Sequence, residues 1–581
     1  MRLKDKITHW TIGRKDGIGT AISDKSYVYF TIGNGRLTET YFPSPDQIVL
    51  HSITLFLNGE KSETEFERSV KIPYKNAPIY RILSSVVKKE IFTDPDSDTL
   101  ILCYRVKNRH NILKIAFPFR FSILEKSENN VLIRMNGIYI FVRLDRKFLI
   151  DSYDKFLLLK ISDTDFTVFI SFGRHEDLGF NKNINVNVSR ERFVAEWNNY
   201  VESFDMAGKG MLYRRSLITI KSMEDKNHRG AAVASLAIPW GSRAELSEKN
   251  GYHLVWVRDL FFSALAMHLA GDTRFANGAL NYMLNKLMRP DGSFKQNTTV
   301  AGEERWHATQ MDQVALPVIF SYMLNRYDLV SELEKSVNFI LKNGPWSEQE
   351  RWEEISGFSP YAMSLQWKAL EYYADMRKNM GLGYENYKNK AKEFARNIPR
   401  FCYTKSGVFY PHQYFVRVSH GNPDKDIISL KGKTFSAREM ISADFLYLVF
   451  TELYRPESQM IKNSIEVVDH ILRVETTKGI SFYRYNGDTY GFDGSVPKGR
   501  LWVILTAERG IYEMLLGNDV SHFLSSVEHF ATSSFMLPEQ VFENGLPTES
   551  AAPLAWSHAA YIILYELANK RRNLFSPLVH K

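Results

Sequence analysis

Between Leu212 and Ala568 the chain alternates two kinds of helical segment, and this alternation limits the possible folds more than any other feature. One kind is amphipathic, as in SELEKSVNFILK and VSHFLSSVEHF. The other kind is apolar nearly all round and rich in small residues, so it must be buried on every side. The amphipathic segments lie near 213–225, 273–288, 329–343, 384–398, 457–473 and 520–531. The apolar segments begin near 258, 308, 359, 440, 500 and 553.

Six buried helices that alternate with six half-exposed ones predict an inner ring of helices wrapped by an outer ring, which is an (α/α)6 barrel. Pro360 and Pro553 fall at two of the inner starts, where a proline in the first turn is tolerated. All six inner helices then begin at the same end of the barrel. We therefore expect the six preceding loops to converge on one mouth and to carry the chemistry.

The first 205 residues follow a different pattern, of short segments rich in β-branched and aromatic residues. Examples are YVYFTIG, KIAFPFRFSIL and FTVFISFG, separated by turn signals such as NGE and MNG. Such strands predict a large β-sandwich. The fold class is thus multidomain β + α, with an N-terminal β-super-sandwich (1–205), a linker and first helix (206–228) and the barrel (229–581).

One turn of this half, DPDSD, mimics the start of a calcium loop. It lacks the glycine at the sixth position and the glutamate at the twelfth, so Asp94 to Asp98 are predicted to form a hairpin turn. The two cysteines, Cys103 and Cys402, are far apart and offer neither a disulfide framework nor metal-ligand spacing. His253, His268 and His307 show no zinc-site spacing and are interpreted as packing or polar-network residues, so no metal or cofactor is expected.

The net charge of +8 and the pI near 9.0 are compatible with a nucleic-acid partner, but the basic residues are interspersed with acidic ones, as in KNKAKEFARN. This pattern favours a solvated surface, so no nucleic-acid partner is expected. No stretch reaches membrane-spanning length, and MRLKDKITHW lacks the apolar run of a signal peptide. The sequence thus favours a cytoplasmic protein with no membrane partner, and it leaves a secreted form open.

Most of the six loops carry tryptophans, carboxylates, an arginine or amides. One tryptophan near a helix start is usually part of a core, and one Arg–Asp pair is often only a salt bridge, but their coincidence at one mouth suits a polyol ligand. Rings can stack on the C–H faces of a sugar while polar groups bond its hydroxyls. The candidate residues are Tyr252, Trp256, Arg258, Asp259, Trp306, Gln310, Asp312, Trp352, Glu353, Glu354, Tyr485, Tyr490, Arg500, Trp502, Glu539 and Gln540.

Several motifs resemble one family. VWVRD, the W-x-x-x-Q-x-D pattern, WEE followed by G-F, and the late PEQ before a Trp-Ser helix look like the glucoamylase family of glycoside hydrolases, family 15. KDGIGTAISDKSYVYFTIGNGRLTETYFPSPD is similar to the N-terminal β-sandwich of the prokaryotic glucoamylases and glucodextranases. The resemblance therefore covers nearly the whole chain, and its motifs recur in order.

This resemblance implies an inverting, exo-acting hydrolase that releases β-D-glucose from the non-reducing ends of maltooligosaccharides or α-glucans. It implies that Glu353 is the general acid and Glu539 the general base. Sugar-binding positions implied by the family pattern or by the loops are Tyr252, Trp256, Arg258, Asp259, Trp306, Gln310, Trp352, Glu354, Arg500 and Trp502. A glucodextranase, a trehalase of the same family, a disaccharide phosphorylase and a non-catalytic sugar-sensing protein are the alternatives.

The adjacent pair Glu353 and Glu354 fits this chemistry. Acidic residues are favoured near a helix start by the helix dipole, which is the simpler explanation of the pair. Glycoside cleavage by inversion instead needs one protonated carboxyl and one carboxylate that activates water from the opposite face. We expect the charge of Glu354 to raise the proton affinity of Glu353 and to help keep it protonated. A phosphorylase needs only the acid, so the presence of Glu539 favours hydrolysis.

Overall fold

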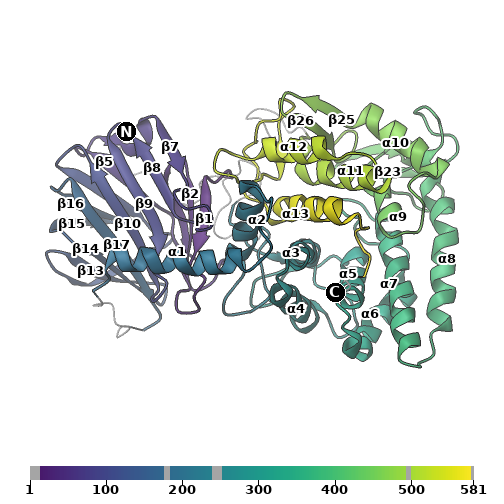
Figure 1. Ribbon diagram of the computed structural model, residues 1–581, viewed down its shortest axis with the longest axis horizontal. Helices are drawn as coiled ribbons and strands as arrows, with labels where there is room; N and C mark the ends of the chain where they lie inside the picture. The colour runs from purple at the N-terminus through teal and green to yellow at the C-terminus, as the bar shows by residue number, and fades with distance from the viewer. Residues whose placement is uncertain (1–12, 176–182, 238–251, 492–498, 578–581) are drawn as a thin grey trace.

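The computed structural model describes residues 13–175, 183–237, 252–491 and 499–577. Figure 1 shows a layered β domain beside a helical domain, with α1 (Val186–Glu202) running along the β domain toward the helices. The apolar core of the helical domain extends into the β domain, where it includes the fully buried Tyr29 and Tyr41. The two domains therefore share a continuous packed interface.

The β domain consists of two antiparallel sheets. The first has the order β1 (Gly17–Thr20), β2 (Tyr29–Gly33), β3 (Arg36–Tyr41), β5 (Ser52–Leu57), β11 (Asn111–Ala116), β16 (Phe156–Ile161) and β15 (Phe148–Tyr153), with β4 (Ile48–Leu50) on β3 and β6 (Lys61–Ser62) on β5. The second has the order β12 (Ser122–Lys126), β13 (Asn130–Met135), β14 (Ile138–Leu144), β17 (Asp165–Gly173), β10 (Thr99–Val106), β9 (Val87–Thr93), β8 (Tyr80–Ser84) and β7 (Arg68–Lys71). Because side chains alternate along a strand, Leu157 and Leu159 of β16 both point into the core between the sheets. The predicted sandwich is confirmed.

Two details of this domain refine the sequence prediction. The segment KIAFPFRFSIL, predicted as one strand, is divided between β11 and β12 in different sheets, with Pro118 in the irregular link. The DPDSD segment is a hairpin turn between β9 and β10, as predicted. Two acids of this turn bind helix α1: Asp94 accepts a hydrogen bond from Ser189 Oγ at 2.6 Å, and Asp96 forms an ion pair with Arg192.

Helix α1 was not predicted, because the segment from 186 to 202 is largely polar. Its start is set by Asn185, whose side chain accepts hydrogen bonds from the first helical N–H groups. Phe193, Trp197 and Val201 recur every four residues on one buried face, and Trp197 Nε1 donates to the carbonyl of Thr20 at 3.0 Å. The helix therefore forms because it packs against the sandwich.

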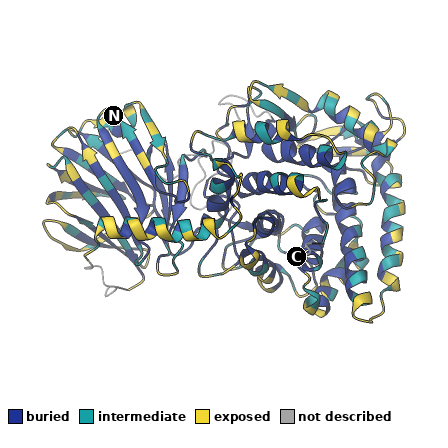
Figure 2. Cartoon of the chain, in the orientation of Figure 1, coloured by how far each residue is buried: buried dark blue, intermediate teal, exposed yellow. Residues whose placement is uncertain are grey.

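The helical domain has the predicted alternation. The outer helices are α2 (Met211–Ser222), α4 (Thr273–Tyr282), α6 (Val330–Asn343), α8 (Glu385–Cys402), α10 (Gln459–Ile471) and α12 (Ser521–Phe530). The inner helices are α3 (Val257–Ala270), α5 (Met311–Met323), α7 (Pro360–Asn379), α9 (Tyr447–Phe450), α11 (Val503–Leu515) and α13 (Ala555–Lys570). Figure 2 shows α11 and α13 buried along most of their length, whereas α8 alternates buried and exposed residues. This is the (α/α)6 barrel.

Two inner segments differ from the prediction. The fourth apolar segment forms only a 3-10 turn and one turn of α-helix, because Glu452 just beyond it adopts a left-handed φ of 66° that ends the helix. Pro360 is in the first turn of α7 as predicted, but Pro553 lies before α13, which begins at Ala555. Pro553 therefore belongs to the loop and not to the helix.

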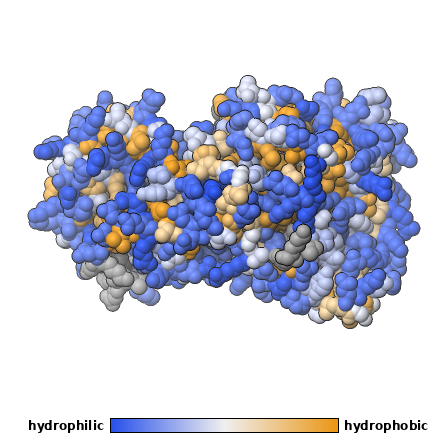
Figure 3. All heavy atoms as spheres, in the orientation of Figure 1, coloured by the Kyte–Doolittle hydropathy of each residue, from blue (hydrophilic) through white to orange (hydrophobic). Residues whose placement is uncertain are grey.

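The surface seen in Figure 3 is mostly hydrophilic, with apolar side chains scattered in small groups. No helix within residues 13–175, 183–237, 252–491 or 499–577 combines the length and the apolar character that crossing a bilayer requires.

Candidate active site

Short strands tie the loops at the barrel mouth together. β18 (Val255–Trp256), β19 (Asn297–Thr298) and β20 (Glu304–Trp306) join the first two loops into one small sheet. β25 (Arg473–Thr476), β26 (Gly479–Tyr483), β27 (Leu501–Trp502) and β28 (Gln540–Val541) join the fifth and sixth loops into another. The first sheet brings the rings of Trp256 and Trp306 to 5.9 Å, and the second places Trp502 at 5.1 Å from Trp352, both edge to face.

These loops enclose a cavity of about 410 Å³, which is the size of a small-ligand site. Its lining includes all but two of the twelve catalytic and sugar-binding candidates, namely Tyr252, Trp256, Arg258, Asp259, Trp306, Trp352, Glu353, Glu354, Trp502 and Glu539. Gln310 lies behind the wall, where its Oε1 accepts a hydrogen bond from Arg258. Arg500 lies outside the wall, 2.7 Å from Glu543 and over the ring of Phe542.

Glu353 is held at the wall by Arg258, whose Nη2 donates to Oε1 at 3.0 Å. Its backbone has a φ of 65°, a left-handed conformation that is strained for a residue with a side chain and that is enriched at active sites. Burial raises the pKa of Glu353. The positive charge of Arg258 and a hydrogen bond from Gln310 lower this pKa in part, and the negative charge of Asp312 raises it further. The carboxyl therefore keeps its proton to a higher pH than an ordinary glutamate.

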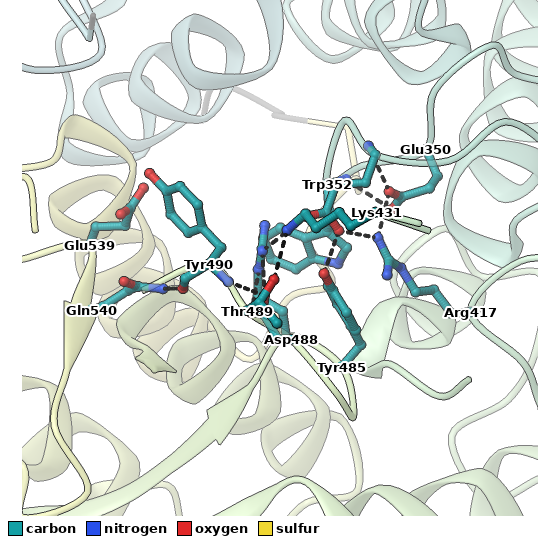
Figure 4. Close-up of polar contacts among 12 residues, drawn as sticks. Glu350, Trp352, Arg417, Lys431, Tyr485, Asp488, Thr489, Tyr490, Glu539 and Gln540 are labelled. Atoms are coloured by element: carbon teal, nitrogen blue, oxygen red, sulfur yellow. Dashed lines mark hydrogen bonds and ion pairs between the residues drawn. The ribbon is translucent and has the colours of Figure 1, made fainter. Parts of the chain in front are cut away.

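Glu539 lies in the sixth loop and is almost fully buried. The hydroxyl of Tyr252 donates to its Oε1 at 2.6 Å, and Oε2 accepts no hydrogen bond from any residue that the structure describes. Burial raises the pKa of Glu539 to about 7, against the opposing effects of the Tyr252 hydrogen bond and the positive charge of Arg484. Figure 4 shows Glu539 facing Tyr490, whose hydroxyl is 2.7 Å from that of Tyr252.

Glu354 is surrounded by cations. Its carboxylate lies 2.8 Å from both Arg417 and Lys431 and 3.4 Å from Arg484, and it also accepts the hydroxyl of Tyr485. Burial alone would raise its pKa, but these partners lower it to about 2. Figure 4 shows Lys431, Arg417 and Tyr485 converging on this side of the site.

This arrangement corrects the expected role of Glu354. Its charge is offset by three cations and is not among the leading causes of the raised pKa of Glu353, which are burial and Asp312. Glu354 is instead an ionised anchor that orders Arg417, Arg484 and Lys431 at the rim of the cavity.

Several residues of the lining were not predicted. Arg484 packs against the rings of Trp352 and Trp502, with its guanidinium carbon 5.2 Å from each ring centre, and it pairs with Asp488 at 2.7 Å. It lies in a polar loop without periodicity, so no pattern marks it. Lys431 lies at the tip of a hairpin formed by β23 (Ile427–Leu430) and β24 (Lys433–Ser436), in the fourth loop.

Arg351 was also missed, and here a signal existed. It is completely buried beneath Trp352 and donates to Glu508 and Asp444. Glu508 lies in an inner helix that the sequence predicts to be buried, and a buried acid requires a buried cationic partner. Trp556 and Leu554, from the start of α13, complete this side of the cavity.

The comparisons with known proteins agree with the fold. A family model described as glycosyl hydrolases family 15 matches residues 209–516, and one described as glucodextranase, domain N, matches residues 5–119. The chain is 33% identical to a glucoamylase of a Clostridium species, over 96% of this chain and 90% of that protein. It is 25% identical to an uncharacterized glycosyl hydrolase of Methanocaldococcus jannaschii, over 81% of this chain and 75% of the relative.

A solved structure, a bacterial glucoamylase complexed with acarbose, superposes with a TM-score of 0.93 at 29% identity, covering 99% of this chain and 97% of that one. A barrel whose mouth presents a half-buried and a buried carboxyl among tryptophans, joined to this sandwich, defines a glycoside hydrolase. The chain belongs to family 15 of the glycosyl hydrolases.

Proposed function

We propose that this enzyme is an inverting, exo-acting α-glucoside hydrolase that releases β-D-glucose from the non-reducing ends of maltooligosaccharides and α-glucans. The observation that carries the proposal is that Glu353 and Glu539, two carboxyls with raised pKa values, line one cavity together with tryptophan rings. The relative that is called a glucoamylase and the bacterial glucoamylase that binds acarbose support the choice of substrate.

In this proposal Glu353 donates its proton to the glycosidic oxygen as the bond to the anomeric carbon breaks. Arg258 then stabilises the carboxylate that remains, because its hydrogen bond to Oε1 is already in place. The raised pKa of Glu353 keeps the proton available before the reaction.

Glu539 acts on the attacking water. Tyr252 holds Oε1, so Oε2 is the oxygen that takes a proton from the water as the water adds to the opposite face of the sugar. The bond to the leaving group and the bond to water are on opposite faces, so the product is the β-anomer. Release of glucose and exchange of one proton from Glu539 to solvent and one from solvent to Glu353 restore the starting state.

The alternatives differ in what they need from these residues. A phosphorylase replaces the activated water by phosphate and needs no base. In this chain the hydrogen bond from Tyr252 favours the carboxylate form of Glu539, and burial makes that carboxylate a stronger base. A glucodextranase or a trehalase would share both carboxyls and differ only in the linkage cleaved.

A substrate panel tests the proposal. Glucose release is measured from maltotriose, isomaltotriose and trehalose, each with and without phosphate, using Glu353→Gln and Glu539→Gln as controls. We expect phosphate-independent glucose from maltotriose with the wild type and less than about one hundredth of that rate with either variant. Exclusive cleavage of isomaltotriose or trehalose would replace the proposed linkage, and a requirement for phosphate would replace hydrolysis by phosphorolysis.

A further inference from the structure

The β-sandwich contacts the loop that carries Glu539. The backbone N–H of Lys15 donates to the carbonyl of Ala552 at 2.7 Å, and the N–H of Ala552 donates back to Gly13 at 3.1 Å. The preceding residue, Ala551, contacts Glu539, because the N–H of Glu539 donates to the carbonyl of Ala551 at 2.8 Å. The segment at 551–552 is thus held between the N-terminal domain and the backbone of Glu539.

A second contact leads to the side chain of Glu539. Tyr41, the last residue of β3, places its hydroxyl 2.8 Å from Nε2 of His253, and the two rings lie 5.2 Å apart. His253 follows Tyr252, whose hydroxyl donates to Glu539. The backbone carbonyl of Tyr252 accepts from Ser235, and Ser235 Oγ donates to the carbonyl of Pro553 at 2.6 Å. The two contacts therefore belong to one connected network.

Buried charged groups near Tyr41 are themselves paired. Lys15 and Glu39 form an ion pair that is almost completely buried, and Thr31 Oγ1 donates to Glu39 at 3.0 Å. Burial lowers the pKa of His253 to about 4, with the nearby charges of Glu39 and Lys15 acting in opposite directions. His253 is consequently neutral around neutral pH, and its contact with Tyr41 persists there.

We propose that the β-sandwich is a positioning element of the active site, in which Tyr41 acts through His253 and Tyr252 to orient the carboxyl of Glu539. The hydroxyl of Tyr41 also lies 3.5 Å from the carbonyl of Leu236, and Tyr41 is not part of the cavity lining, so it is a positioning residue and not a catalytic one. The kinetic part of this inference rests on the proposed role of Glu539 as the base.

Tyr29 provides a matched control. It lies on the neighbouring strand β2, is equally buried, and belongs to the same apolar core between the domains. Its hydroxyl donates to the carbonyl of Glu224 at 3.1 Å and accepts from the N–H of Lys226, just after α2. Removing this hydroxyl therefore weakens the same domain interface without touching the path to Tyr252.

The kinetic test compares Tyr41→Phe with Tyr29→Phe. For Tyr41→Phe we expect kcat to fall about tenfold with KM changed less than about twofold, as for misplacement of a reacting group. The acidic limb of the kcat/KM profile should move to higher pH, because a weaker hydrogen bond from Tyr252 lets the pKa of Glu539 rise. Tyr29→Phe should keep the wild-type kinetics, and Tyr41→Phe should add little in a Tyr252→Phe background.

Hydrogen–deuterium exchange provides a readout that does not need turnover. Peptides covering 252–257 and 537–541 should exchange faster in Tyr41→Phe than in Tyr29→Phe. Equal exchange of these peptides in the two variants, or a pH profile of Tyr41→Phe that matches the wild type, would overturn the inference. Absence of wild-type activity on the substrate panel would count against the proposed function alone, because the exchange comparison still decides the positioning role.

Discussion

Arg258 lies between two acids, with Nη2 at 3.0 Å from Oε1 of Glu353 and Nη1 at 2.6 Å from Oδ2 of Asp312. The positive charge of Arg258 is therefore shared between the two acids, and Asp312 affects the pKa of Glu353. Asp312 partly neutralises Arg258, and it also places a negative charge near Glu353. Both effects favour the protonated form of Glu353.

Asp312→Asn should therefore lower the pKa of Glu353. The general acid must be protonated, so the basic limb of the kcat/KM profile reports loss of that proton as the pH rises. We expect this limb to move to lower pH by about one unit in the variant, with the acidic limb unchanged. A profile measured with maltotriose from pH 4 to pH 9, roughly spanning the ordinary pKa values of Glu and His, provides the measurement. A shift to higher pH would contradict the described charge arrangement.

Glu354→Gln tests whether the charge of Glu354 affects the pKa of Glu353. Because three cations offset the charge of Glu354, its removal should leave the basic limb within about 0.3 pH units of the wild type, in contrast to Asp312→Asn. KM should rise, because Arg417, Arg484 and Lys431 lose a shared anchor. A basic limb that falls as far as in Asp312→Asn would restore the direct role of Glu354 in keeping Glu353 protonated.

Tyr252→Phe should change the acidic limb of the kcat/KM profile. The general base must be deprotonated, so kcat/KM falls as the pH drops through the pKa of Glu539, which is about 7. The hydrogen bond from Tyr252 stabilises the carboxylate, and its removal raises that pKa further. The acidic limb should then begin at higher pH, while thermal unfolding changes little because the ring remains. An unchanged acidic limb would separate Tyr252 from the ionisation of Glu539.

Arg351→Met tests the buried ion pairs beneath the site. Arg351 is paired with Glu508 and Asp444 in the centre of the barrel, and its removal leaves two buried carboxylates without their cation. We expect the free energy of unfolding to fall by about 3–5 kcal/mol, measured by urea denaturation. Arg105→Met is the control, because the pair of Arg105 with Asp165 is exposed and should contribute nothing measurable. Equal stability of the two variants would contradict the structural role of Arg351.

The sequence allowed the order of the twelve barrel helices to be predicted, because a helix that is apolar all round and one with a single apolar face are distinguishable from their residues alone. Helix α1 was missed because it depends on packing against the sandwich through Phe193 and Trp197. The short α9 was overestimated because the left-handed residue that ends it, Glu452, has no distinctive neighbour pattern.

The site followed the same division. The loops before the inner helices could be identified as the mouth, and most candidates with aromatic or acidic side chains do line the cavity. Gln310 and Arg500 lie off the cavity, where their side chains bond to Arg258 and Glu543, and no linear pattern in the sequence predicts these partners. Arg484 and Lys431 enter the lining from loops whose paths are set only by tertiary contacts.

In the proposed mechanism, Glu353 and Glu539 act from opposite faces of the bound sugar. Proton NMR of maltotriose hydrolysis, recorded before the product anomers interconvert, is the decisive experiment. We predict that the first glucose signal belongs to the β-anomer in the wild type, and that no glucose accumulates over the same interval with Glu539→Gln. A first signal from the α-anomer, or undiminished release by Glu539→Gln, would contradict the roles assigned to these two carboxyls.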